Sequence, residues 1–184
     1  MEFNRLLSSA FSTYGEPELG ETARETKSEK KHQNINKKKY HLITNEKEID
    51  EWINEAEEAG ELAIDTETTS LDAHQADLVG ISLSTKIGKA CYIPVGHKFK
   101  GCLKKENVIK KLKPLLEDKS IKKIGQNIKF DFIILFKQGI NMNSMEDTML
   151  MSYVLDAGKN RHNMDTLSEI HLQHKTISFK EIVG

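Results

Sequence analysis

Residues 62–72 read LAIDTETTSLD, a short apolar run that ends in two carboxylates, Asp65 and Glu67, spaced two residues apart. The apolar run predicts a buried β-strand over residues 62–68. Because residues i and i+2 of a strand point to the same side of a sheet, both carboxylates should project together, with Cα atoms roughly 7 Å apart. Two carboxylates about 5 Å apart repel by about 3 kcal/mol at an effective dielectric constant of 20. The pair therefore requires a cation, a shared proton or full solvation.

A divalent metal ion would satisfy the first of these requirements. Mg²⁺ and Mn²⁺ prefer carboxylate and water oxygens, and such sites commonly serve phosphate chemistry. The alternative is that the two acids mark a solvated strand end, because TETTSLD is rich in turn-forming residues. Enzymes that form an aspartyl phosphate use a similar acid pair, Asp-x-Asp, and the glutamate at position 67 disfavours that class.

A third acid, Asp131, lies in the segment GQNIKFDF at residues 125–132. We predict an apolar helix over residues 127–139, on which Asn127 and Asp131 would share one face. An ionised carboxylate in so apolar a helix is costly unless it is paired or bound to a metal ion. The alternative is an aspartate on an exposed stripe of that helix.

The pattern on either side of these segments predicts an α/β protein with a mixed sheet flanked by helices. Three consecutive strands suggest a meander, and a fourth strand lies between helices. Pro114 should kink or end its helix locally. Strands are expected at 62–68, 78–85, 89–96 and 121–126, and helices at 44–60, 103–118, 127–139, 146–158 and 164–172.

Composition predicts two parts in the chain of 184 residues. Residues 1–39 should form a short amphipathic helix over the first 11 residues and then a disordered, charged linker, because the linker has almost no large apolar side chains to bury. Residues 40–184 should form one globular domain. The cysteines Cys91 and Cys102 fit neither a zinc site nor a disulfide framework.

Charge and hydropathy set further expectations about partners and location. The formal net charge of -1 argues neither for nor against a nucleic-acid partner. The lysines of HKFKGCLKKENVIKKLK, residues 97–113, could form a basic patch beside a DNA path, although a solvated helix face is the simpler interpretation. No apolar run is long enough to span a membrane, and the first residues lack the pattern of a secretion signal. We therefore expect a cytoplasmic protein without a membrane partner.

The motifs occur in an order that resembles the proofreading 3′ to 5′ exonuclease domain of bacterial DNA polymerase I. The resemblance covers about residues 40–184 and rests on several separate segments: AIDTETTSLD, LVGISLS, YIPVGH, LKPLLED, GQNIKFD, DTMLMSYVLD and RHNMDTLSEIHLQHKTISFKEI. It implies a ribonuclease H-like fold and hydrolysis of the 3′ terminal phosphodiester of single-stranded DNA, in proofreading during bacterial DNA replication and repair. It also implies a monomer whose full-length protein carries a polymerase domain.

The resemblance assigns roles to residues at matching positions. Asp65 would bridge two divalent metal ions, Mg²⁺ or Mn²⁺. Glu67 would hold the inner ion and orient the attacking water, and Asp131 would support the outer ion through water. Leu71 would wedge against the terminal base. The remaining matching positions would touch the strand or its terminal nucleotide: Gln126, Asn127, Lys129, Arg161 and Phe179.

One motif of that family has no counterpart in the sequence. The family's last motif is a tyrosine, three intervening residues and an aspartate, whereas Tyr153 and Asp156, like His162 and Asp165, are spaced three apart. The resemblance thus implies a domain that is incomplete at the C-terminus. Two hypotheses follow: an exonuclease domain with a metal-binding half-site, or a catalytically inactive remnant that at most binds single-stranded DNA. A third is that the chain does not fold stably.

Overall fold

The computed structural model describes residues 12–13, 40–177 and 181. The chain divides into two compact units, residues 1–33 and residues 34–184. In the first unit Ser12 and Thr13, which we predict to begin the linker, are helical. The helix predicted for the first 11 residues and the rest of the linker lie outside the described residues. No helix in the described part of the chain is both long and apolar enough to cross a membrane.

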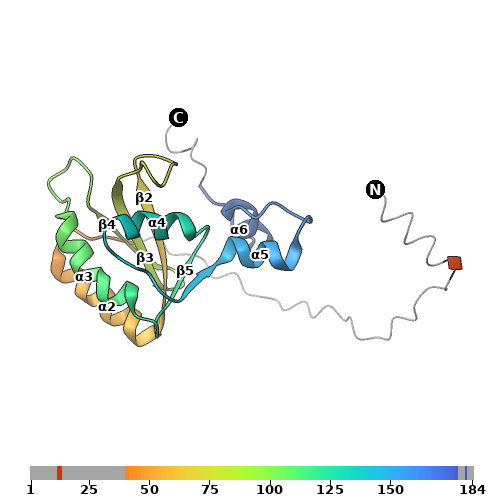
Figure 1. The fold of residues 1–184 in the computed structure, drawn as a ribbon, viewed down its shortest axis with the longest axis horizontal. Helices are drawn as coiled ribbons and strands as arrows, with labels where there is room; N and C mark the ends of the chain where they lie inside the picture. Colours follow the sequence, from red (N-terminus) through yellow and green to blue (C-terminus); the bar gives the residue numbers. More distant parts are fainter. Residues whose placement is uncertain (1–11, 14–39, 178–180, 182–184) are drawn as a thin grey trace. The chain divides into compact units, whose positions relative to one another are not determined.

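The second unit is built on a mixed, six-stranded sheet in the order β1-β4-β3-β2-β5-β6 (Figure 1). β2, β3 and β4 form the predicted antiparallel meander, whereas β1 is parallel to β4, and β5 is parallel to both β2 and β6. The strands are β1 (Tyr40–Leu42), β2 (Glu61–Thr68), β3 (Leu78–Lys86), β4 (Lys89–Pro94), β5 (Lys122–Gly125) and β6 (Met145–Asp147).

The two outermost strands, β1 and β6, were not expected. Each has three residues, too few for an alternating apolar pattern to show in the sequence. The helix predicted for residues 146–158 is corrected accordingly, because Glu146 and Asp147 belong to β6. The helix that corresponds to this prediction, α5, spans Thr148–Asp156 and is followed by α6, Met164–Leu172.

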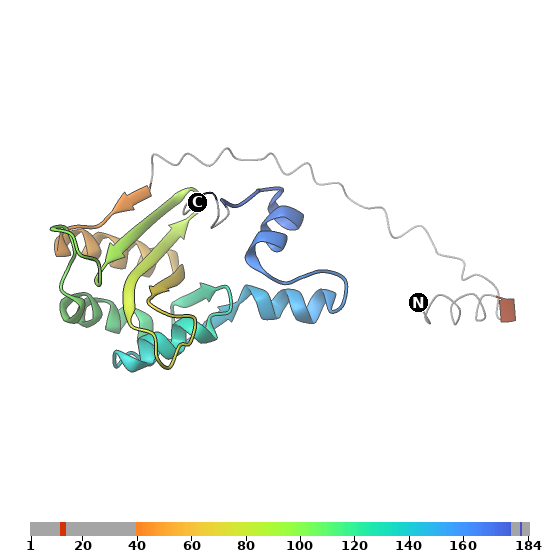
Figure 2. The ribbon, with the colours of Figure 1, turned by 90° about the horizontal axis from the view of Figure 1, so that it is seen from above.

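Helices α2 (Glu46–Ala59), α3 (Lys105–Glu117) and α4 (Lys129–Lys137) lie on one side of the sheet (Figure 2). α2 follows its sequence signals closely. The Asn45 side chain accepts a hydrogen bond from the backbone N–H of Lys47, and Gly60 ends the helix at a φ of 69°, the left-handed conformation that glycine favours. Its predicted apolar face, including Ile49 and Trp52, is buried.

α3 continues past Pro114 for another three residues, so the expected local end at this proline is wrong. The reason lies in the packing and bonding of the last turn. Leu115 and Leu116 are buried in the core, and the backbone N–H of Asp118 bonds the carbonyl of Pro114. Burial of two leucine side chains offsets the hydrogen bond that a proline cannot donate.

Burial alternates along β2 as the sequence predicts. Leu62, Ile64 and Thr66 are buried, whereas Asp65 and Glu67 are exposed on the opposite face. The two acids therefore share one face of the sheet, in the C-terminal half of β2. That face is opposite the one that packs on the core.

The segment before α4 departs from the prediction. α4 begins at Lys129, and Asn127 lies in a turn with a φ of 56°, so Asn127 does not share a helical face with Asp131. The cause is Asp147, whose Oδ1 accepts the N–H of Asn127 at 3.0 Å and whose Oδ2 accepts the N–H of Ile128 at 3.0 Å. This carboxylate holds the turn in a non-helical conformation.

Asp147 also caps the next helix. Its Oδ1 accepts the backbone N–H groups of Met149 at 2.9 Å and Leu150 at 3.3 Å, which α5 itself cannot satisfy. One carboxylate thus bonds four backbone donors and joins the turn after β5 to the start of α5.

We expect Asp147→Ala to lower the free energy of unfolding by about 2–4 kcal/mol, because it removes a helix cap and leaves the buried N–H of Ile128 without an acceptor. Asp147→Asn, which keeps one acceptor oxygen, should cost less. Urea unfolding followed by circular dichroism measures both. An alanine variant within about 0.5 kcal/mol of the wild type would contradict this role for Asp147.

Candidate functional site

Asp65 and Glu67 stand on the face of the sheet opposite α2, α3 and α4. Their register partners on β3 are the small residues Ser82 and Gly80. The pairing of β2 with β3 shifts between Glu67 and Thr68, where the strand leaves the sheet. The two carboxylates are thus held by regular strand structure and open to solvent.

Asp131 approaches the same stretch of β2 from α4. It is only 2% exposed, and its Oδ1 accepts the backbone N–H of Thr66 at 2.8 Å and the Thr66 hydroxyl at 2.6 Å. The last pair between β2 and β5 is Ala63 with Ile124, so Thr66 lies beyond the end of that ladder. Asp131 supplies the acceptor that β5 no longer provides. Its carboxylate therefore lies beside the backbone between Asp65 and Glu67.

The charges of Glu67 and Asp131 act on Asp65. Although the Asp65 side chain reaches solvent, desolvation by the surrounding protein, followed by the negative charges of Asp131 and Glu67, raises the pKa of Asp65 to about 6. Burial also raises the pKa of Asp131, although its hydrogen bonds from Thr66 act in the opposite direction. A bound cation lowers the free-energy cost of ionising carboxylates in such an arrangement.

In donor chemistry the three residues fit a divalent metal ion. Carboxylate oxygens are the ligands that Mg²⁺ and Mn²⁺ prefer, and Asp65 and Glu67 offer them on one face. Across residues 12–13, 40–177 and 181, no three His, Cys, Asp or Glu side chains already stand in a metal-binding cluster. The structure therefore holds an acid pair with a third acid in electrostatic reach, and the assignment of metal ligands stays a prediction.

The loop after β2 presents Leu71, whose side chain is 97% exposed. The loop is closed at its base by two hydrogen bonds: Thr69 N–H to the carbonyl of Asp77, and Asp77 N–H to the Thr69 hydroxyl. Lys137, at the end of α4, holds this loop by hydrogen bonds. Its ammonium donates to the carbonyls of Ala73, His74 and Ala76 at 2.7–3.1 Å. An apolar side chain on a fastened loop is available to an incoming ligand.

Gln126 is tied into the protein at both ends of its amide. Its Nε2 donates to the carbonyl of His162 at 2.7 Å, and its Oε1 accepts the Thr148 hydroxyl at 2.6 Å. The ring of His162 in turn bonds the Ser152 hydroxyl at 2.8 Å. These bonds hold the loop between α5 and α6, on which Arg161 is exposed. Gln126 thus positions the loop that carries Arg161.

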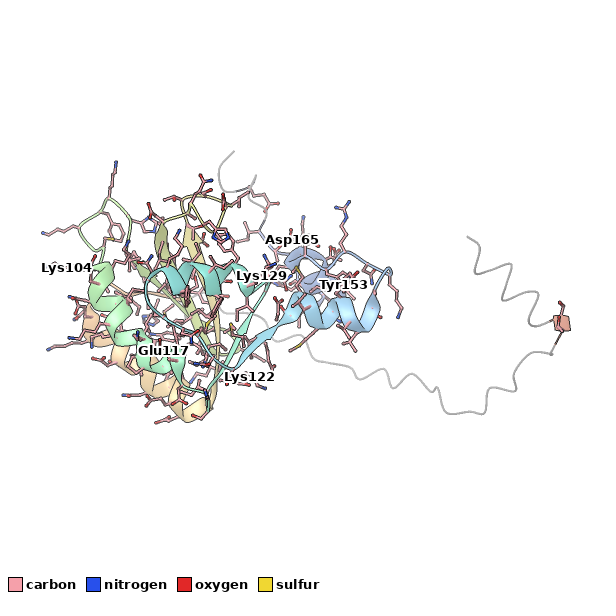
Figure 3. All side chains as sticks on the ribbon, viewed as in Figure 1. Lys104, Glu117, Lys122, Lys129, Tyr153 and Asp165 are labelled. Carbon is pink, nitrogen blue, oxygen red and sulfur yellow. The ribbon has the colours of Figure 1, made fainter. Side chains whose placement is uncertain are left out.

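Asn127 and Lys129 are both exposed at the start of α4. Lys129 lines a groove of about 710 Å³ between α4 and α5, and Figure 3 labels it together with Tyr153 of α5. None of the three acids lines this groove. Phe179 lies outside the described residues. The groove is lined by Ile128, Lys129, Phe132, Met145, Glu146, Asp147, Leu150, Met151, Val154 and Leu155.

Two residues important for the geometry of the site were not singled out from the sequence. Thr66 donates both hydrogen bonds that place Asp131, and nothing in the alternating strand pattern reveals a partner 65 positions away. Asp147 organises the turn before α4. A signal for Asp147 was present, because an aspartate followed by Thr and an apolar run is typical of a helix start.

A central strand that presents two acids at its exit, on a mixed sheet with helices on one face, defines a ribonuclease H-like α/β protein, as predicted. Within this class the chain belongs to the 3′-5′ exonuclease family, whose model matches residues 40–184. It is 45% identical over 157 residues to DNA polymerase I of Rhizobium leguminosarum and 42% identical over 151 residues to that of Pseudomonas aeruginosa. These matches cover 74% and 79% of this chain.

Among solved structures, the chain is similar to Brucella melitensis NrnC with bound Mg²⁺, with a TM-score of 0.57 and 25% sequence identity. The match covers 76% of this chain and 64% of that one. The chain spans 15–16% of the length of the two DNA polymerase I relatives. The expected family is confirmed.

The raised pKa of Asp65 predicts how stability depends on pH in metal-free buffer. A carboxyl with a higher pKa in the folded state binds its proton more tightly there, so deprotonation costs folding free energy as pH rises from about 4 through about 6. We expect Asp65→Asn to remove this cost.

The difference in unfolding free energy, variant minus wild type, should therefore grow between about pH 4.5 and about pH 7. Urea unfolding in EDTA at both pH values measures it, and Glu61→Gln on the same face of β2 is the control. A difference that is equal at both pH values would rule out the shifted pKa.

Proposed function

We propose that this chain is the 3′ to 5′ exonuclease domain of a DNA polymerase I-type protein and hydrolyses the 3′ terminal phosphodiester of single-stranded DNA. The observation that carries the proposal is the acid pair on the open face of β2, with Asp131 bonded to the backbone between the two acids. Membership of the exonuclease family supports the reaction type. Proofreading during replication and repair is the role proposed for the longer protein.

Asp65, Glu67 and Asp131 would hold two divalent metal ions, Mg²⁺ or Mn²⁺. Such ions supply positive charge to the attacking and leaving oxygens of an in-line displacement. The protein contributes rigidity: β2 holds Asp65 and Glu67 in register, and Thr66 fixes one oxygen of Asp131. Mg²⁺ in the NrnC structure supports the choice of ion.

Other exposed residues would bind the strand. Leu71 would pack against the terminal base, and Lys129 and Arg161 would bind phosphates by charge. Asn127 would donate hydrogen bonds from its turn, and Gln126 would act through the loop that carries Arg161. Phe179, by the family resemblance, would touch the strand or its terminal nucleotide. We further propose a cytoplasmic monomer with no membrane partner, joined to a polymerase domain in the longer protein.

Metal-dependent nuclease activity tests the proposal directly. With Mg²⁺ or Mn²⁺ the chain should shorten a 5′-labelled single strand from its 3′ end by releasing nucleoside 5′-monophosphates, and Asp65→Asn should slow this release by about 100-fold or more. Calorimetry should show Mn²⁺ binding to the wild type that the variant lacks. Glu61→Gln, an exposed acid on the same face of β2, is the matched control and should match the wild type.

The alternative is an inactive protein that at most binds single-stranded DNA. It predicts that the chain binds an oligonucleotide but releases no mononucleotide with either metal ion. Release that is equal in wild type and Asp65→Asn would also contradict the proposed site, because it would come from a contaminating nuclease.

Leu71→Ala tests the apolar contact with the terminal base. Because Leu71 is 97% exposed, the substitution should change stability by less than about 0.5 kcal/mol. The kcat/KM for single-stranded DNA should fall roughly 5-fold, since the leucine side chain is buried only when the base is bound. Ile87→Ala, at another exposed apolar side chain, is the control. An unchanged kcat/KM for Leu71→Ala would contradict the contact.

A further inference from the structure

A row of side chains leads away from the acids across the open face of the sheet. Asp65 pairs with Ser82 of β3, and Ser82 pairs with Tyr92 of β4. Register partners on adjacent antiparallel strands point to the same face, and strands are about 4.8 Å apart. Tyr92 therefore stands on the same face as Asp65, with their Cα atoms about 10 Å apart.

The ring of Tyr92 leans from its strand toward the acids. It lies over Gly80, where a Cβ atom would meet the Tyr92 hydroxyl oxygen at 1.9 Å, so only glycine leaves room for it. Gly80 is the register partner of Glu67. The Tyr92 hydroxyl therefore lies over the register partner of Glu67.

Two further rings continue the row into the loop after β4. Tyr92 Oη bonds His97 Nε2 at 2.6 Å, with ring centroids 5.7 Å apart. His97 is 6.1 Å from Phe99, ring centroid to centroid, and Phe99 is 44% exposed. Phe99 in turn lies over Gly101, where a Cβ atom would meet its ring at 2.6 Å. The rings thus form a continuous strip, defined here as Tyr92, His97 and Phe99.

Two lysines alternate with these rings. Lys98 and Lys100 are exposed, and neither forms an ion pair with any residue that the structure describes. Lysines of α3 differ, because Lys111 pairs with Asp50 and Lys113 with Glu117. The loop therefore carries two lysines without an ion pair among the described residues.

We propose that the strip is a base-stacking subsite for the single strand behind its 3′ terminus, with Lys98 and Lys100 bound to its phosphates. This subsite rests on the proposed exonuclease function and adds the path of the single-stranded DNA across the protein. Exposed rings that alternate with cations are what a sequence-tolerant single-strand site requires, because every base has a face that can stack. At 3.4 Å per stacked nucleotide, the 10 Å from Asp65 to Tyr92 corresponds to about three nucleotides.

Packing alone does not explain the strip. A ring that served only to cover the sheet would be buried, whereas Phe99 keeps 44% of its surface exposed. A hydrogen bond between Tyr92 and His97 already fixes both side chains. Little rotamer freedom would therefore be lost when single-stranded DNA binds. His97 and Phe99 present their rings to solvent and would carry the stacking.

The test uses the whole chain, EDTA and 5′-fluorescein oligothymidylate of about eight nucleotides, with binding followed by anisotropy. Phe99→Ala should weaken binding about 5-fold or more, and Phe99→Trp should retain it. A second oligonucleotide carries abasic residues at the fifth and sixth positions from its 3′ end, because ring steps of 5.7 Å and 6.1 Å separate Phe99 from Tyr92. The wild type should bind it about 5-fold more weakly than the intact strand, and Phe99→Ala should bind both equally.

Controls separate this inference from the function on which it rests. Phe136→Ala, at an exposed aromatic residue of α4, should bind DNA like the wild type. Lys110→Ala, at an exposed lysine of α3, should do the same. The double variant Lys98→Ala, Lys100→Ala should bind more weakly and with a smaller dependence on salt concentration. Thermal melts check folding. If the wild type degrades DNA and Phe99→Ala binds like Phe136→Ala, the subsite is wrong and the exonuclease stands. If the wild type neither binds nor degrades single strands, both proposals fail.

Discussion

The hydrogen bonds from Thr66 to Asp131 are the interaction on which the geometry of the site depends. β5 pairs with β2 only as far as Ala63 and Ile124, so the backbone of β2 continues beyond its neighbour with a free donor. The carboxylate of Asp131 takes that donor and the Thr66 hydroxyl, and in doing so fixes α4 against β2. A buried N–H without a partner would cost free energy, so the acid has a structural role in addition to the one proposed in metal binding.

This double role explains how the fold accommodates a buried carboxylate beside the backbone of the acid pair. Asp131 is buried but receives two hydrogen bonds, while Asp65 and Glu67 project into the open space on the other face. The remaining strain appears in the raised pKa of Asp65 and of Asp131. Strain of this kind is common where a site is prepared for a charged ligand, because the ligand relieves it on binding.

Two other polar groups extend the same rigidity outward. Asp147 bonds four backbone donors and sets the turn that carries Asn127, and Lys137 bonds three carbonyls and fastens the loop that carries Leu71. Each connects segments far apart in the sequence. Exposed residues proposed to bind the strand are therefore positioned by the hydrogen bonds of two charged side chains, Asp147 and Lys137.

The sequence by itself determined the elements with strong periodic patterns: the three strands of the meander, the helices α2, α3, α4 and α6, and the shared face of Asp65 and Glu67. These follow from local alternation and from capping signals, which depend on neighbours within a few positions. The order of its motifs also determined the family. The short strands β1 and β6 were beyond such reasoning, since three residues carry no periodicity.

Only the tertiary structure decided how the parts of the site meet. The turn at Asn127, the continuation of α3 past Pro114 and the bonds of Gln126 all depend on partners outside the local segment: a carboxylate on β6, the hydrophobic core, and the loop before α6. The same is true of Tyr92 over Gly80. Local sequence specifies which conformations are favoured, whereas long-range hydrogen bonds and close packing select among them.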